Sequence, residues 1–289
     1  FLSTDYGVTW GNQTTPVAVQ RWKAVAADST STKLAAVTAI GNIWLSTNSG
    51  VDWTEQVFGG SPPAAQNWHS IASNHDGSIL AAADNLVNIY VSTDSGANWT
   101  AQASGLAWWC VTCQTVGGLP ATTKLAATVQ IGNIWLSTNS GDDWTEVKTG
   151  EVGIVTPPAP NLEWRGIAAD ATATNLAAVV YGGNIWLSFD SGFAWTEVKT
   201  GEVGIVTPPT ADSFWRDVAI DSTGTIIVAV PSPGNIWKST DSGATWIEDT
   251  TVGTKKNWES VASNAAGDRF AAVAYLDDIW MWPYVRLAT

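Results

Sequence analysis

Short apolar runs separated by Gly, Asn, Asp, Ser and Thr follow one another along the whole chain. Residues 22–27, 33–39, 42–46 and 53–57 show the pattern, since each run is rich in Ala, Val, Ile or Trp and ends at turn-forming residues. Runs of this length and composition indicate β-strands, whereas helical spacing of apolar residues is nowhere sustained. The chain is therefore predicted to be all-β.

These four runs belong to a repeat of roughly 45 residues. Its most regular part is the phrase Ser-x-Asp/Asn-x-Gly-x-x-Trp, which occurs six times. Four short strands at this period are typical of one propeller blade, so the sequence predicts a six-bladed β-propeller with four-stranded blades. The prediction is a single domain over 1–289, with repeats at approximately 13–58, 59–104, 105–149, 150–200, 201–250 and 251–289.

The two ends of the chain divide one repeat between them. Residues 1–10 hold a copy of the phrase, whereas residues 251–289 hold three strand-like runs and no copy. We expect residues 1–12 to supply the outer strand that closes the last blade, because closure removes an exposed sheet edge. The residues after Pro283 are then expected to form a tail.

The repeated phrase carries its own folding signal. The Asn or Asp side chain can accept hydrogen bonds from nearby amides, and the Gly supplies the positive φ of a tight hairpin. The Trp at the end of the phrase covers the turn and buries a large apolar area. A structural role is therefore expected for the six positions Asp5, Asn48, Asp94, Asn139, Asp190 and Asp241.

The phrase resembles the Asp box of sialidase-like (BNR repeat) and other Asp-box β-propellers, whose pattern is Ser-x-Asp-x-Gly-x-x-Trp on the same hairpin. The resemblance covers the whole chain but implies a fold more than an activity. Asp-box propellers include sialidases, sortilin-type receptors, xyloglucanases, photosystem assembly factors and lectins. The resemblance also implies that the boxes lie on the face away from the active site. Asn48 and Asn139 lack the charge of Asp, so no metal is expected at the boxes.

The 19 Trp residues follow the register of the repeat. Trp residues of the boxes and of the third strands are expected to pack between blades. A third set opens the first strands, which in a propeller start beside the central channel and opposite the boxes. The residue after each of these Trp does not repeat, which favours a ligand contact. The candidate ligand residues are Trp22, Lys23, Trp68, His69, Trp108, Trp109, Trp164, Arg165, Trp215, Arg216, Trp258 and Glu259.

Flat aromatic rings beside hydrogen-bonding groups are well suited to hold a sugar, which stacks its C–H faces and pairs its hydroxyls. The alternative is that the variable residues only hydrate the mouth of a channel.

The composition limits the classes of partner that the chain can bind, because 13 Lys and Arg against 26 Asp and Glu give a net charge of −13. Such a charge disfavours nucleic acid and anionic lipid as partners.

No apolar run approaches the roughly 18 residues of a spanning helix, so no membrane insertion is expected. The chain starts at Phe1 and its only Met is Met281, which suggests a processed product or a fragment, and we expect a secreted or extracellular location. Asn12 and Asn98 match the glycosylation acceptor pattern. Cys110 and Cys113 are expected to be two small buried side chains, with a disulfide or a metal or redox role as alternatives.

Catalysis finds little support in the residues. By the resemblance, a sialidase would need an arginine triad and an Arg-Ile-Pro segment. The chain has only five Arg, whose positions do not form a convincing triad, and it has no Arg-Ile-Pro segment. Glu163, Asp217 and Glu259 are the candidates for a carboxylate pair of a glycosidase. The sequence thus predicts a non-catalytic, lectin-like propeller without cofactor, whose partner is a glycan. A protein-interaction or assembly module is the first alternative and a glycoside hydrolase the second. Oligomeric state and ligand identity stay open.

Overall fold

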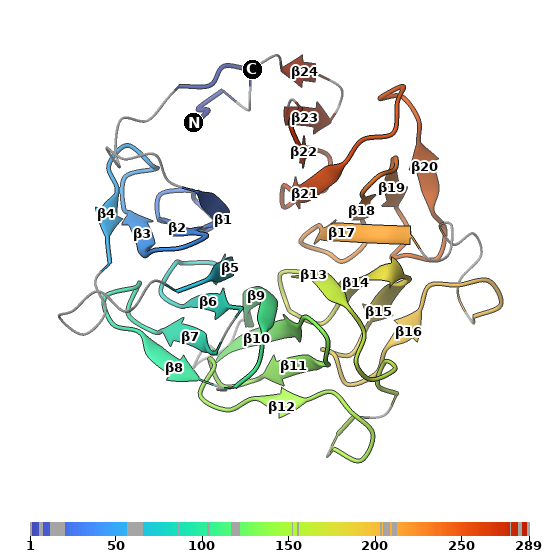
Figure 1. The fold of residues 1–289 in the computed structure, drawn as a ribbon, viewed down its shortest axis with the longest axis horizontal. Coiled ribbons are helices and arrows are strands. Elements are labelled where there is room, and N and C mark those ends of the chain that lie inside the picture. Colours follow the sequence, from blue (N-terminus) through green and yellow to red (C-terminus); the bar gives the residue numbers. More distant parts are fainter. Residues whose placement is uncertain are drawn as a thin grey trace. The chain divides into compact units, whose positions relative to one another are not determined.

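The computed structural model describes residues 2–5, 8–11, 21–56, 66–85, 87–102, 105–116, 122–151, 153–154, 156–202, 204, 209, 213–277, 279–282 and 285–287. In these residues the regular secondary structure consists of the strands β1 to β24 (Figure 1). No helix in the described part is long and apolar enough to cross a membrane. The prediction of an all-β chain is confirmed.

Two compact units make up the chain. The first comprises Phe1–Gln130 and Trp135–Thr145, and the second comprises Ile131–Ile134 and Glu146–Thr289. Within each unit, four consecutive strands pair antiparallel in chain order, as the repeat predicts.

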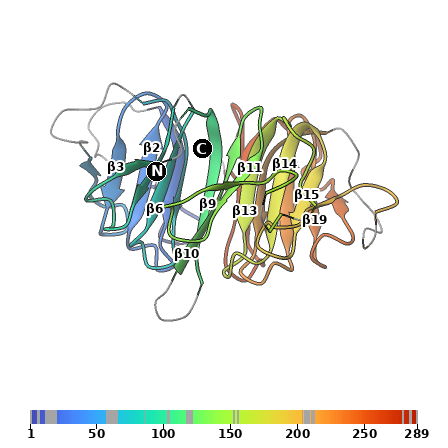
Figure 2. The ribbon, with the colours of Figure 1, turned by 90° about the horizontal axis from the view of Figure 1, so that it is seen from below.

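The first three quartets begin with β1, β5 and β9, and successive first strands pack against each other. Their strands are β1 (Trp22–Ala27), β2 (Leu34–Thr38), β3 (Ile43–Ser46), β4 (Thr54–Glu55), β5 (Trp68–Ser73), β6 (Leu80–Asp84), β7 (Ile89–Ser92), β8 (Thr100–Gln102), β9 (Trp108–Val116), β10 (Thr122–Val129), β11 (Ile134–Ser137) and β12 (Thr145–Glu146). The longest of these, β9 and β10, pair along their whole length (Figure 2).

The next three quartets begin with β13, β17 and β21. Their strands are β13 (Trp164–Ala169), β14 (Leu176–Gly183), β15 (Ile185–Ser188), β16 (Thr196–Glu197), β17 (Ser213–Ile220), β18 (Ile227–Pro231), β19 (Ile236–Ser239), β20 (Ile247–Asp249), β21 (Trp258–Ser263), β22 (Phe270–Ala274), β23 (Ile279–Trp282) and β24 (Val285–Leu287). The quartets of β13 and β17 are joined into one larger sheet, because β14 also pairs with β17.

The C-terminal residues complete the last quartet, so the prediction that residues 1–12 supply its outer strand is wrong. β24 pairs antiparallel with β23, with Arg286 opposite Trp280. The same pairing corrects the expectation of a tail after Pro283. β24 begins at Val285, close in sequence to the end of β23 at Trp282, and bringing such neighbouring segments together costs little chain entropy.

The N-terminal box instead folds on itself and packs on the first quartet. Leu2 and Gly11 form a two-residue bridge around it. A Cβ placed on Gly50 would lie 3.5 Å from the Leu2 side chain. Gly96 of a later box approaches Leu45 in the same way. Leu2 therefore takes the place that a third-strand residue takes in the other repeats.

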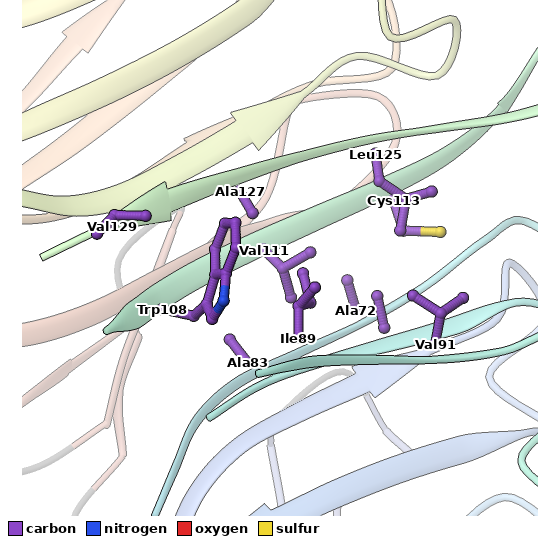
Figure 3. Packing of buried hydrophobic residues seen from close by; sticks show 11 residues of the cluster. Ala72, Ala83, Ile89, Val91, Trp108, Val111, Cys113, Leu125, Ala127 and Val129 are labelled. Atoms are coloured by element: carbon purple, nitrogen blue, oxygen red, sulfur yellow. The ribbon is translucent and has the colours of Figure 1, made fainter. Parts of the chain in front are cut away.

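The hydrophobic core lies between neighbouring quartets and is rich in Trp. Figure 3 shows one such cluster, in which Trp108 packs with Ala83, Ile89 and Val111. The Trp108 side chain has no exposed surface. Box residue Trp144 packs against the edge of this cluster. The predicted packing role of the box Trp residues is confirmed here.

Each fully described Asp box is held by hydrogen bonds among its own residues, as its sequence predicts. In the box at 239–246, Ser239 Oγ donates to Asp241 Oδ1 (2.9 Å) and accepts from the amide of Gly243 (2.8 Å). Asp241 Oδ1 also accepts from the amide of Thr245 (2.8 Å), and Trp246 Nε1 donates to the Gly243 carbonyl (2.8 Å). The φ of Gly243 is 88°. These bonds are all internal, which makes the box a structural element.

The two Asn boxes keep this geometry by exchanging a carboxylate and an amide. Asn48 Nδ2 donates to Asp52 Oδ2 (2.7 Å), four residues along the chain. In the Asp box at 92–99 the roles are reversed, and Asn98 Nδ2 donates to Asp94 Oδ2 (2.7 Å). The second Asn box contains the corresponding pair Asn139 and Asp143. The negative charge is thus moved within the box and not lost.

Cys110 and Cys113 are free thiols, so the disulfide considered from the sequence is wrong. Both lie within the continuous strand β9, where residues three apart point to opposite faces. Burial raises the pKa of the Cys113 thiol, and the charge of Asp76 raises it further. The expectation of two small buried side chains is confirmed for Cys113, whereas Cys110 is half-buried.

Candidate functional site

A β-bulge follows the first Trp of every quartet. In β17, Trp215 lies opposite Pro231 and Asp217 lies opposite Val230, so Arg216 is an extra residue without a partner in the ladder. The same shift occurs in the other five first strands. Bulges redirect side chains and are common beside functional sites. The extra residues are the variable ones of the sequence, namely Lys23, His69, Trp109, Arg165, Arg216 and Glu259.

In the five quartets that contain an Asp box, the bulge lies at the end of the strands away from that box. In the quartet of β17, Trp215 faces Pro231 at one end, whereas Ile227 faces Ser239, the first residue of the box, at the other. The sequence-based placement of the variable residues opposite the boxes is therefore confirmed within each of the five quartets that contain a box.

The first-strand Trp residues are mostly buried, so their predicted stacking on a sugar is wrong for five of the six. The exposed fraction is 0 % for Trp68, Trp108, Trp164 and Trp258 and 1 % for Trp215. Trp68 Nε1 donates to the carbonyl of Gly41 in the preceding quartet (2.9 Å). A ring without an exposed face has no surface to offer a ligand. Only Trp22, which is 45 % exposed, could make such a contact.

Two of the extra residues converge on one aromatic ring in the second unit. The guanidinium carbon of Arg165 lies 4.9 Å from the centre of the Tyr181 ring, and that of Arg216 lies 5.2 Å from it. Cations placed over an aromatic ring are attracted to its negative face. Tyr181 stands at the end of β14 and therefore between the bulges of β13 and β17.

Phe214 covers the outer side of this arrangement. Its ring centre is 4.9 Å from that of Tyr181, and 47 % of the residue is exposed. Phe214 pairs with Tyr181 across the extra contact between β14 and β17. Its ring lies over Gly182, whose φ of 69° favours glycine there. The result is an aromatic surface next to two cations.

Glu163 supplies the negative charge of the group. Its carboxylate forms an ion pair with Arg165, whose side chain is only 10 % exposed against 36 % for Glu163. We call Glu163, Arg165, Tyr181, Phe214 and Arg216 the arginine–tyrosine cluster. Two guanidinium groups and one carboxylate leave it with one net positive charge, in a chain whose total is −13.

The second cation of the cluster is not neutralised by the described part of the chain. No carboxylate described by the structure lies within ion-pair distance of Arg216, and its buried Nε makes no hydrogen bond to a described residue. Burial lowers the pKa of Arg165, Glu163 opposes this shift, and the neighbouring charge of Arg216 lowers the pKa further. A half-buried guanidinium that lacks an anion is a ready site for one.

The variable residues of the first unit form a different environment. The rings of His69 and Trp109 lie 4.1 Å apart, and His69 Nε2 is 3.2 Å from Asn85 Nδ2. Lys23 is exposed. In the second unit Glu259 is also exposed. The structure thus brings together His69 with Trp109, and Arg165 with Arg216.

Two of the three carboxylates considered for glycoside hydrolysis, Asp217 and Glu163, are engaged in contacts with the protein, whereas Glu259 is exposed. Asp217 is half-buried and accepts hydrogen bonds from Ser260 Oγ (2.7 Å) and from the amides of Val261 (3.0 Å) and Val218 (2.9 Å). Burial raises its pKa against the effect of these bonds. Asp217 therefore links β17 to β21, while the carboxylate of Glu163 binds Arg165.

Two other kinds of site have limited support. No group of three or more His, Cys, Asp or Glu suited to a metal ion occurs among the described residues. A cavity of about 20 Å³ lined by Val228, Lys238, Phe270 and Trp282 is apolar and no larger than a water molecule. Asn98 is exposed, so it is open to glycosylation, and Asn12 lies outside the described residues.

Sequence reasoning identified Arg165 and Arg216 but missed Tyr181 and Phe214. A signal for both exists in the repeat. Phe214 precedes a first-strand Trp at a position held by Arg21, Asn67 and Glu163 in other repeats, so this column varies as well. Tyr181 is followed by two Gly, where two other repeats have Ile and Gly. The residue before each first-strand Trp therefore contributes to the site as much as the residue after it.

No protein-family model and no curated protein matches the chain. Solved structures of similar fold include YCF48 bound to D1 peptide, at 10 % identity and a TM-score of 0.64 over 91 % of this chain and 77 % of that one. The GH74 xyloglucanase from Xanthomonas campestris is 18 % identical with a TM-score of 0.64, over 90 % of this chain and 44 % of that one.

The Cps50 (Swd1) β-propeller domain of Myceliophteria thermophila also has a TM-score of 0.64, at 13 % identity, over 94 % of this chain and 86 % of that one. The chain thus spans less than half of the xyloglucanase. Identities this low establish the fold alone. The strand quartets and these similarities together show that the chain is an all-β propeller with four-stranded antiparallel blades, similar in structure to Asp-box-type propellers.

Proposed function

We propose that this protein is a non-catalytic binding propeller that holds an acidic carbohydrate at the arginine–tyrosine cluster. The observation that carries the proposal is Arg216, a half-buried cation that lacks a carboxylate among the described residues and shares the Tyr181 ring with the exposed ring of Phe214. A uronic-acid or sialic-acid type of sugar carries both groups that this surface would complement, a carboxylate and an apolar C–H face.

The chemistry of binding follows from the side chains. The planar guanidinium of Arg216 can donate two parallel hydrogen bonds to a carboxylate, which fixes the orientation of the ligand. Phe214 can stack on the C–H face of the ring. Phe214 thereby takes the stacking role that the sequence assigned to the buried Trp residues, while the role proposed for the two Arg is unchanged.

The contacts of the carboxylates favour binding without turnover. A carboxylate-pair glycosidase needs two acids facing the same bond, about 5–9.5 Å apart. Both oxygens of Asp217 accept bonds from the protein, and the carboxylate of Glu163 is paired with Arg165.

We also propose that the six quartets form one six-bladed propeller domain, and that the protein works outside the cell.

Titration with two sugars that differ only at C6 tests this function. Protein NMR or calorimetry measures the binding. Methyl glucuronide should bind, and the neutral methyl glucoside should bind at least tenfold more weakly. Arg216→Ala should abolish the preference, whereas Arg216→Lys should keep part of it because the charge remains. Arg269→Ala removes the same charge at an exposed position elsewhere and should change nothing. Equal binding of both sugars, or an unaltered Arg216→Ala, would refute the proposal.

A second candidate is a protein-interaction module, and one observation favours it. The similar structure of YCF48 is bound to a peptide. A peptide with an acidic side chain or a free C-terminus beside an aromatic residue would present the same two groups to Arg216 and Phe214. If such a peptide binds and methyl glucuronide does not, with the same loss in Arg216→Ala, the second candidate replaces the first.

A further inference from the structure

The charge balance of the arginine–tyrosine cluster is set by one residue, Glu163. It is the only carboxylate of the described chain that forms an ion pair with either guanidinium. Glu163 is also the more exposed partner of the pair, so it lies on the solvent side of Arg165. An anion that approaches Arg216 therefore meets a site with one net positive charge and with a fixed negative charge at its rim.

The position of Glu163 ties it to the site by more than the ion pair. It directly precedes Trp164, whose side chain is fully buried, and the amide of Tyr181 donates to the Glu163 carbonyl (2.8 Å). Tyr181 is the ring under both guanidinium groups. The backbone of Glu163 is therefore held against the centre of the cluster, and its charge has a fixed place there.

We propose that Glu163 is a specificity-determining residue that limits the ligand of this site to a single negative charge. The inference rests on the proposed function, namely that the cluster binds an anionic sugar. A carboxylate neutralises the one positive charge that Glu163 leaves available. A phosphate monoester carries up to two charges at neutral pH and meets repulsion from Glu163. Glu163 thus selects a carboxylated sugar over a phosphorylated one.

The selection has a different origin from the attraction to Arg216. Attraction favours anions over neutral sugars and increases with ligand charge. Repulsion by Glu163 opposes that increase, so the preference between one and two charges depends on Glu163. A unit charge several ångströms from the ligand at a surface changes affinity on the order of tenfold at low salt. Added salt should weaken the effect.

The test compares three ligands with the same ring at pH 7.5 and low salt: methyl glucoside, methyl glucuronide and methyl glucoside 6-phosphate. The unaltered protein should bind the glucuronide more tightly than the phosphate. Glu163→Gln keeps the shape of the side chain and an acceptor for Arg165 but removes the charge. It should shift the ratio of glucuronide affinity to phosphate affinity toward the phosphate by about tenfold. Glu248→Gln removes the same charge from an exposed residue that accepts from Asn235 Nδ2, and should leave the ratio unchanged.

The outcomes separate this inference from the proposed function. In one outcome, the unaltered protein prefers the glucuronide over the glucoside, but Glu163→Gln leaves the ratio of glucuronide to phosphate affinity unchanged. Glu163 is then not the residue that selects the ligand, and the binding function stands. If neither acidic sugar binds better than the glucoside, the binding function fails and the inference fails with it. Circular dichroism and thermal melting of Glu163→Gln establish that the variant is folded. Should it unfold, Glu163→Ser provides the same comparison with a smaller neutral side chain.

Discussion

Replacing Asn48 by Asp would place two carboxylates in direct contact within one box. Asn48 Nδ2 lies 2.7 Å from Asp52 Oδ2, so Asn48→Asp exchanges a hydrogen bond for a repulsion at the same place. The other bonds of the side chain survive, because its Oδ1 still accepts from Ser46 Oγ (3.0 Å) and from the amide of Asp52 (2.9 Å). The effect is therefore confined to one pair of atoms.

The size of the effect follows from the distance. Two unit charges 2.7 Å apart repel by about 1.5 kcal/mol in the dielectric of water. Loss of one exposed hydrogen bond to a charged group adds about 1 kcal/mol. The free energy of unfolding should thus fall by roughly 2–3 kcal/mol, which corresponds to a Tm lower by about 3–5 °C for a domain of this size.

The double variant Asn48→Asp/Asp52→Asn should restore stability. It gives this box the arrangement that Asp94 and Asn98 have in the next one, where Asn98 Nδ2 donates to Asp94 Oδ2 (2.7 Å). The double variant should come within about 0.5 kcal/mol of the parent protein, although its two single changes need not be additive. Asp52→Asn alone leaves two amides that can still pair, so it should lower the free energy of unfolding by less than Asn48→Asp does.

Urea unfolding followed by Trp fluorescence measures all four proteins at pH 7 and again at pH 3. The penalty of Asn48→Asp should shrink at pH 3, where carboxylates take up protons and the repulsion is relieved. Two results would refute the reasoning: an Asn48→Asp protein as stable as the parent at pH 7, or a double variant no more stable than Asn48→Asp.

Further predictions concern the core, the thiols and the carboxylates. Trp258→Phe, at a fully buried ring whose Nε1 donates to a carbonyl, should lower the free energy of unfolding by about 2 kcal/mol in urea and leave sugar affinity unchanged. Cys113 should resist a thiol reagent in the native protein and react in urea, and the native mass should show no disulfide. Hydrogen bonds from Thr9 lower the pKa of Asp5 to about 2, so its contribution to stability should be complete above pH 4 and be lost as pH falls toward 2 in acid titrations. Burial raises the pKa of Asp217, so its contribution is greatest below pH 4 and declines as pH rises; Asp217→Asn should remove this decline in urea unfolding between pH 3.5 and 7.

The strand quartets and boxes could be predicted from the sequence because their determinants are local. A box uses a Ser, an Asx, a Gly and a Trp within eight residues, and the hydrogen bonds of the box at Ser239 run between those same residues. The outer strand of the last quartet was predicted wrongly, because the copy of the phrase in residues 1–10 suggested a partner there. Pairing between β23 and β24 depends on the backbone, and the sequence near Arg286 carries no repeated signal for it.

The candidate site was predicted only in part, because periodicity reports position but not exposure. The first-strand Trp is buried in five of the six quartets, and a buried ring and a ligand-binding ring have the same sequence pattern. The convergence of Arg165 and Arg216 depends on Tyr181, which reaches them through the pairing of β14 with β17. The Gly183–Ser213 rung of this pairing recurs as an isolated bridge at Gly41–Gln66, Gly132–Leu162 and Gly234–Lys256. Among the described residues the Tyr181–Phe214 rung has no such counterpart, so comparison among repeats does not reveal it.

The six bulges also make this protein a scaffold for directed evolution. Each extra residue contributes no rung to its ladder, so its replacement leaves the pairing of the sheet intact. A combinatorial library could vary these positions together without altering a box or a buried Trp. Selection from such a library would show how many chemistries one backbone can display, and the chain itself would be its first member.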